Sequence, residues 1–181
     1  MGMIINPYRF TNKEPEVIDF CSEENYNTGS NVYAGSNITS GQSFTSVNNY
    51  KITTCKFYIV KSGSPTGNIY AKVWDHTGTY GTSSKPTGSY LAISDVINIE
   101  TISTSINLVT FTFSGANQII ISSKNYCVNV ISNNGNSSNY LRIGSNSSAG
   151  THGGNRFYST DETSWSSFAQ DVIFYIYGIK Q

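Results

Sequence analysis

The choice of apolar residues is the feature that most constrains the fold of this chain. It contains 20 Ile and 10 Val but only 3 Leu and 6 Ala, so the best helix formers are scarce. Its 13 Tyr and 9 Phe add to this bias, because β-branched and aromatic side chains fit the pleated, half-buried surface of a strand. The sequence therefore predicts an all-β protein whose many Ser, Asn, Thr and Gly residues form turns and polar loops.

Segments with a two-residue alternation recur along most of the 181 residues. Residues 51–60 alternate in this way, and residues 68–74 place Val73 inward and Trp74 on the opposite face. A turn containing Pro and Gly at 62–67 separates them, so we expect a hairpin. Further strands are predicted at 91–93, 96–99, 108–113, 118–121, 126–132, 140–143, 155–159 and 171–179. Nine to ten such strands predict a jelly-roll-like antiparallel β-sandwich.

The regions outside these strands also carry expectations. Residues 1–35 contain few sustained alternations and are interpreted as an irregular N-terminal arm, which precedes a sandwich domain over 36–181. The arm either packs on its own sandwich or docks on a neighbouring subunit. Residues 75–89 are interpreted as one long loop, and Asn134-Gly135 suits a tight hairpin turn. The run at 171–179 is apolar on both faces, which indicates a central strand or a subunit contact.

Charge and hydropathy exclude several classes of partner. Eleven basic and eleven acidic residues cancel, which leaves no electrostatic footprint for nucleic acid or an anionic membrane. No apolar run reaches the roughly 18 residues that span a bilayer, and the opening residues lack the pattern of a secretory signal. We therefore expect neither nucleic acid nor membrane as a partner.

The cysteines do not indicate a metal site. Cys21, Cys55 and Cys127 are odd in number and lack the spacing of metal ligands. Cys55 and Cys127 lie in strand-like segments, where a free cysteine usually behaves as a small buried hydrophobe. Three free thiols are expected, with one disulfide as the alternative.

No arrangement of residues predicts catalysis. The acidic residues are scattered, so no spacing pairs two carboxylates for glycoside hydrolysis. The two histidines, His76 and His152, lie in loops far apart in the sequence, which gives no nucleophile and base pair. We expect a protein that is not an enzyme, with no catalytic residues and no required cofactor.

Two binding hypotheses remain. A structural calcium ion could be held by carboxylates in loops, for which Asp75, Asp161 and Glu162 are the candidates, although such residues more often cap turns. A sugar could stack on aromatic rings beside polar side chains; the candidates are Tyr70, Trp74, Tyr80, Arg142, Asn155 and Trp165. The alternative is that Trp74 and Trp165 cover the core.

About three quarters of the chain resembles a known module, and the resemblance depends on a series of short segments. The carriers are QSF at 42–44, CKFYIVKSGSPTGNIYAKVW at 55–74, SKPTGSYLAISD at 84–95, LVTFTFSG at 108–115, NYCVNVIS at 125–132, SSNYLRIG at 137–144 and GGNRFYS at 153–159. Their order resembles choice-of-anchor R domains and the jelly-roll decoration or fibre proteins of tailed phages. This resemblance implies a β-sandwich that often associates as a trimer, and it implies no catalytic residue.

These observations favour a non-enzymatic virion structural protein of a prokaryotic virus, such as a capsid decoration, head-fibre or tail-associated subunit. The expected partners are sister subunits and other virion proteins, and the expected location is the virion surface. The alternative is an extracellular carbohydrate-binding module that contacts a glycan.

Overall fold

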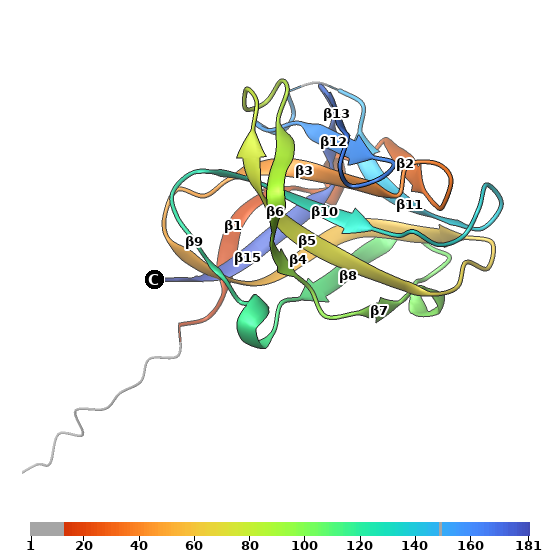
Figure 1. Cartoon of the computed structure of the whole chain (residues 1–181), viewed down its shortest axis with the longest axis horizontal. Coiled ribbons are helices and arrows are strands. Elements are labelled where there is room, and N and C mark those ends of the chain that lie inside the picture. Colours follow the sequence, from red (N-terminus) through yellow and green to blue (C-terminus); the bar gives the residue numbers. More distant parts are fainter. Residues whose placement is uncertain (1–12, 149) are drawn as a thin grey trace, which may run out of the picture.

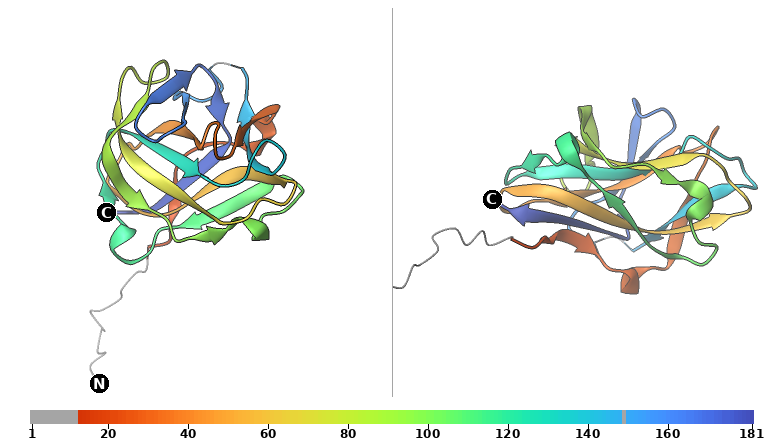
Figure 2. Two further views of the ribbon diagram at one scale, coloured as in Figure 1. Left: turned by 45° about the vertical axis from the view of Figure 1, so that its right-hand side comes forward. Right: turned by 90° about the horizontal axis from the view of Figure 1, so that it is seen from below.

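The computed structural model describes residues 13–148 and 150–181, which form two antiparallel sheets packed face to face (Figures 1 and 2). The first sheet contains β1 (Glu16–Cys21), β2 (Thr28–Val32), β4 (Tyr50–Ser62), β8 (Asn107–Thr112), β9 (Ile120–Ile121), β11 (Tyr140–Asn146), β14 (Asp171–Val172) and β15 (Phe174–Lys180). The second contains β3 (Thr39–Thr45), β5 (Asn68–Thr77), β6 (Lys85–Ile93), β7 (Ile97–Asn98), β10 (Asn125–Ile131), β12 (Arg156–Ser159) and β13 (Trp165–Phe168).

The helical content is small. The described part of the chain has three short 3-10 helices, all in loops: η1 (Glu23–Asn25), η2 (Ile99–Thr101) and η3 (Gly115–Asn117). Among the described residues, no helix has the length and apolar character needed to span a membrane.

Eight strands have the order of a jelly roll. The strands β1, β15, β4 and β8 are successive neighbours in the first sheet, and β3, β10, β5 and β6 are successive neighbours in the second. When only these eight strands are numbered 1 to 8 along the chain, their order is 1-8-3-6 in the first sheet and 2-7-4-5 in the second. This order is the double Greek key of a jelly roll. The predicted antiparallel jelly-roll sandwich is confirmed, although the fifteen strands of the described residues exceed the nine to ten expected.

The core lies between the two sheets and is built from the inward positions of the alternating segments. Phe57 and Ile59 on β4, Val73 on β5, Phe111 on β8 and Val128 on β10 are all fully buried. The rings of Phe57 and Phe111 meet edge to face, with centroids 6.1 Å apart. The inward position that the alternation predicts for Val73 is therefore confirmed.

The predicted hairpin between residues 51–60 and 68–74 is wrong. Strands β4 and β5 belong to different sheets, and the turn containing Pro65 and Gly67 carries the chain from one to the other. The turn at Asn134-Gly135 likewise joins β10 to β11 across the sandwich. In each case, the two strands joined by the turn bury their apolar side chains in the same core. The sequence alternates equally strongly whether the two strands pair in one sheet or face each other across the core, so it cannot distinguish the two arrangements.

The long loop expected at 75–89 is also wrong. Strand β5 continues to Thr77 and β6 begins at Lys85, with Asp75 opposite Thr87 and Thr77 opposite Lys85. These strand ends project beyond the core, as the tall hairpin in Figure 1 shows. The residues of these strand ends are polar and do not alternate with apolar ones. The sequence therefore gave no hydrophobic pattern from which their pairing could be predicted.

Residues 16–32 of the expected irregular arm are mostly part of the first sheet. Strand β1 pairs with β15, and β2 pairs with β11. The register of β1 shifts between Val17 and Asp19, which breaks its alternation and hides the strand. Residues 1–12 of that arm lie outside the described residues. Strand β15 lies between β1 and β4, in agreement with a central place for the last apolar run.

Candidate functional site

The six candidate sugar-binding residues do not form one site. Tyr70, Trp74, Tyr80, Asn155 and Trp165 belong to the second sheet and its loops, whereas Arg142 lies on β11 of the first sheet. Only part of the predicted set can therefore act on one ligand.

Trp74 is buried and is not an exposed platform. Its side chain is 5 % exposed, and its indole Nε1 donates a hydrogen bond to Asn129 Oδ1 at 2.7 Å. The half-buried ring of Trp165 lies across it edge to face, with centroids 5.4 Å apart, and also contacts Phe157. Trp74 offers no stacking surface because Trp165 of β13 covers it. It packs with Cys127 and Phe157 in a small cluster that is separate from the main core, so the alternative, in which it covers that core, is not what the structure shows either.

Asn155 and Tyr80 have partners within the protein. Asn155 is fully buried, and its side-chain oxygen accepts a hydrogen bond from Ser84 N at 3.0 Å, so its amide fixes the β5–β6 hairpin loop. Burial raises the pKa of Tyr80 to about 12, and its ring lies 6.1 Å from that of His76. Because it is buried, Asn155 cannot contact a ligand at the surface.

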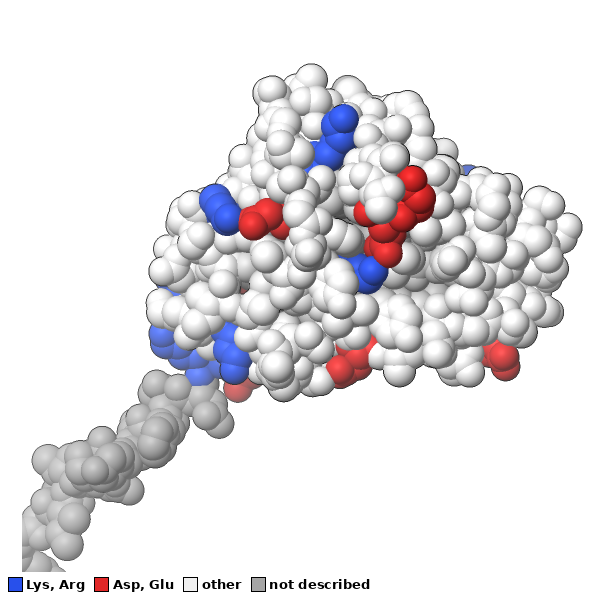
Figure 3. Space-filling model, in the orientation of Figure 1, with Lys and Arg blue, Asp and Glu red and all other residues white. Residues whose placement is uncertain are grey.

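Tyr70 lines a pocket of about 450 Å³ on the outer face of the second sheet. Its wall is made by Tyr70 and Lys72 of β5, Ile93 of β6 and Ile131 of β10, and its rim includes Asn68 and Asn134. These residues point outward because they alternate with core residues on the same strands, and Tyr70 is paired with Ile131 while Lys72 is paired with Ile93. Charged residues are sparse on the face of the molecule that Figure 3 shows.

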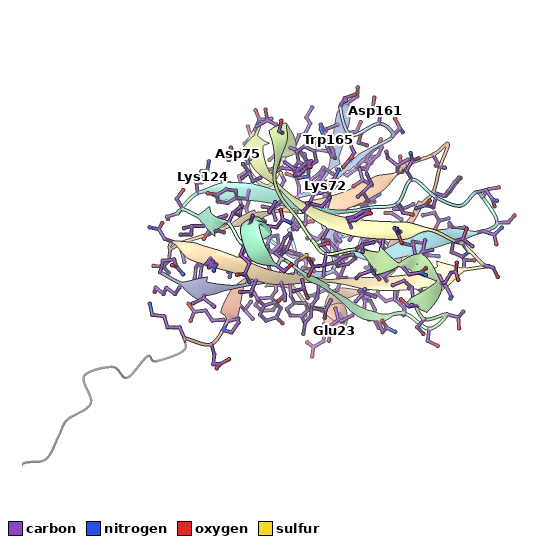
Figure 4. All side chains as sticks on the ribbon, turned by 60° about the horizontal axis from the view of Figure 1, so that its bottom comes forward. Glu23, Lys72, Asp75, Lys124, Asp161 and Trp165 are labelled. Carbon is purple, nitrogen blue, oxygen red and sulfur yellow. The ribbon has the colours of Figure 1, made fainter. Side chains whose placement is uncertain are left out.

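Lys72 is held firmly beside this pocket. Its Nζ lies 2.7 Å from Glu162 Oε2, and both side chains are largely buried. The same ammonium group lies 5.0 Å from the ring centroid of Tyr90 and 5.7 Å from that of Trp74. Trp165 in turn contacts Trp74, and Figure 4 shows Lys72, Trp165 and Asp161 in the same part of the molecule. The positive charge of Lys72 is thus already compensated within the protein.

The three calcium candidates lie in two places and have partners of their own. Asp75 pairs with Lys124 at 2.6 Å (Figure 4), and Glu162 pairs with Lys72. Asp161 caps a turn, where the backbone N–H groups of Ser164 and Thr163 hold the pKa of its carboxyl well below the usual range. Within residues 13–148 and 150–181, no group of three or more His, Cys, Asp and Glu side chains could hold a metal ion.

The structure contains a buried polar network that the sequence did not predict. Gln42 Nε2 donates to Asp171 Oδ1 at 2.9 Å and lies 3.1 Å from His152 Nδ1, while Gln42 Oε1 accepts from Val172 N at 2.9 Å. His152 Nε2 in turn lies 3.0 Å from Asp19 Oδ1. Burial raises the pKa of Asp171. The network joins β3 of the second sheet to β1 and β14 of the first, which indicates a structural role.

The first sheet presents a second surface, which we call the aromatic face: Val17, Phe20, Tyr175 and Tyr177. Val17 and Phe20 are 42 % and 51 % exposed. The ring of Phe20 stacks on that of Tyr175 at 5.4 Å, and Tyr175 stacks on Tyr177 at 6.2 Å. The face is rigid because all four residues lie on the paired strands β1 and β15.

The three thiols are free and buried, as the sequence predicts. Burial raises the pKa of Cys21 to about 12 and also raises the pKa of Cys55 and Cys127. We expect no reaction of the folded chain with a thiol reagent at neutral pH, and three reactive thiols in denaturant without a reductant. Thiol titration with and without denaturant measures this, and one reactive thiol in denaturant would indicate a disulfide.

Neither family models nor curated proteins nor solved structures give a significant match to this chain. The functional inference therefore depends on the jelly-roll fold, the aromatic face and the pocket beside Tyr70.

Proposed function

We propose that this protein is a non-enzymatic structural subunit at the surface of a prokaryotic virus particle, where it assembles with sister subunits and other virion proteins. The jelly-roll strand order supports the proposal, because viral capsid domains commonly use this architecture. The resemblance to phage decoration and fibre proteins points the same way. The aromatic face is the observation that carries the role in assembly.

The aromatic face has the properties of a protein interface. Val17 and Phe20 are adjacent on the outer surface of the sheet, because their strand partners Tyr177 and Tyr175 form a continuous stack. Contiguous apolar patches on soluble proteins mark interaction sites, and aromatic residues are enriched at interface centres. The stack is already ordered, so association would cost little side-chain entropy.

The double substitution Val17→Ser and Phe20→Ser tests the assembly role. We expect the wild-type chain to form a concentration-dependent homo-oligomer and the variant to be largely monomeric, because each change removes an exposed apolar side chain from the interface centre. Native mass by light scattering over a range of concentrations measures this. Deletion of residues 1–35 is unsuitable, because it would remove β1 and β2 from the first sheet.

The matched control is Val47→Ser with Ile120→Ser. These side chains are 69 % and 63 % exposed and lie outside the aromatic face, so the control should keep the wild-type mass. Circular dichroism of both variants should match the wild type. A wild-type chain that is monomeric at every concentration, or a control that dissociates equally, would contradict self-association through this face.

A carbohydrate-binding module is the second candidate function. The observation that favours it is the pocket on the opposite sheet, in which Tyr70 is the aromatic residue and Asn68 and Asn134 supply amides. Jelly rolls also occur in lectin domains, so the fold is compatible with both candidates.

A further inference from the structure

The pocket beside Tyr70 combines an apolar wall with a polar rim. Tyr70, Ile93 and Ile131 form the apolar part, and the amides of Asn68 and Asn134 lie at the rim. An amide both donates and accepts hydrogen bonds, which matches a hydroxyl group that does the same. A volume of about 450 Å³ lies within the range of small-molecule sites. This combination suits a ligand with one apolar face and several hydroxyl groups.

The charge at the pocket favours a neutral ligand. Lys72 is the charged residue of its wall, and the ammonium group is paired with Glu162 Oε2 at 2.7 Å. A bound anion would have to compete with this carboxylate, and its charge would be repelled by Glu162 at short range. A neutral ligand meets no such cost.

The polar rim is held in place before any ligand binds. Asn134 Nδ2 donates to the backbone oxygen of Asn68 at 2.8 Å, which ties the β10–β11 loop to the start of β5. Gly67 has a positive φ of 102°, and a Cβ added there would lie 2.5 Å from Asn134 Oδ1. Glycine at this position therefore allows the two loops to approach closely, and the rim needs no reorganisation on binding.

We infer that this pocket binds a neutral sugar, with the C–H face of a pyranose ring on Tyr70 and its hydroxyl groups on Asn68 and Asn134. The inference deepens the second candidate function and is independent of the assembly role. The aromatic face belongs to the first sheet and the pocket to the second, so either can fail without the other.

Titration of the ¹⁵N-labelled full chain with glucose, galactose or N-acetylglucosamine, each up to about 10 mM, tests the inference. We expect at least one of these sugars to shift the backbone amide signals of Gly67, Asn68 and Asn134 in a saturable way. The Tyr70→Ala variant should weaken this binding by about tenfold or more, because the ring supplies most of the apolar contact. Glucose 6-phosphate should bind no more tightly than glucose.

The matched control is Tyr158→Ala. Tyr158 is another half-buried tyrosine, and it lies on β12, three strands from β5 in the same sheet. Its loss should leave sugar binding unchanged. The inference is overturned if none of the three sugars shifts the pocket signals, if Tyr70→Ala binds as tightly as the wild type, or if the phosphorylated sugar binds more tightly than the neutral one.

Discussion

Replacing Trp74 with Ala is expected to lower the free energy of unfolding by about 3–5 kcal/mol. The indole is 5 % exposed and packs against Phe157 and the half-buried Trp165, so its removal leaves a cavity under β13. Urea unfolding followed by far-UV circular dichroism measures the change. Trp165→Ala should cost less than Trp74→Ala, because part of the Trp165 ring already faces solvent.

Trp74→Phe separates packing from hydrogen bonding. The indole N–H donates to Asn129 Oδ1, and Asn129 Nδ2 donates to Thr39 Oγ1, which donates to the backbone oxygen of Val130. Phenylalanine keeps much of the apolar volume but leaves the buried Asn129 oxygen without its donor, at a cost of about 1–3 kcal/mol. Unchanged stability of Trp74→Ala, together with loss of sugar binding, would show that Trp74 is a ligand platform after all.

The fold was largely predictable because the core of a sandwich imposes a two-residue period on every strand that lines it. Val73 was placed inward from this period alone and is fully buried, as are Phe57 and Val128 on two other predicted strands. Sheet membership was not predictable in the same way. A strand that crosses to the opposite sheet, as β5 does after β4, buries the same side chains as one that turns back in a hairpin.

The candidate site was less predictable because its parts come together only in the folded chain. Tyr70 was identified from the sequence as a candidate aromatic residue for sugar stacking. Its neighbour Asn134 lies 66 residues from Asn68 and is one of 20 asparagines, so composition gave no reason to select it. Gln42 is a similar case, because its partner Asp171 is 129 residues away in the sequence.

Gln42→Glu is expected to lower the free energy of unfolding by about 3–5 kcal/mol near neutral pH. Gln42 is fully buried, and its Nε2 lies 2.9 Å from Asp171 Oδ1, so the substitution places two carboxyl groups at hydrogen-bond distance. Glutamate also lacks the N–H group with which Gln42 donates a hydrogen bond to Asp171. The other titratable groups near this pair, among the described residues, include His152, Asp19, Cys21 and Tyr80.

The penalty should depend on pH with a definite sign. Burial already raises the pKa of Asp171 in the folded protein, and a second carboxylate beside it raises the pKa of the pair further. The folded state then retains a proton that the unfolded chain releases at about pH 4. Stability is therefore lost as the pH rises from about 4 through the pKa of the folded pair, and the penalty is smallest in acid.

Urea unfolding of Gln42→Glu and the wild type across this pH range measures the effect. Gln118→Glu is the matched control, because it adds the same charge at a half-buried position between η3 and β9, outside the network. Its stability relative to the wild type should change little with pH. If the Gln42→Glu penalty were the same in acid as at neutral pH, the loss would come from packing at β3 and not from repulsion. The network would then join the two sheets through shape and neutral hydrogen bonds, with the charge of Asp171 playing no part.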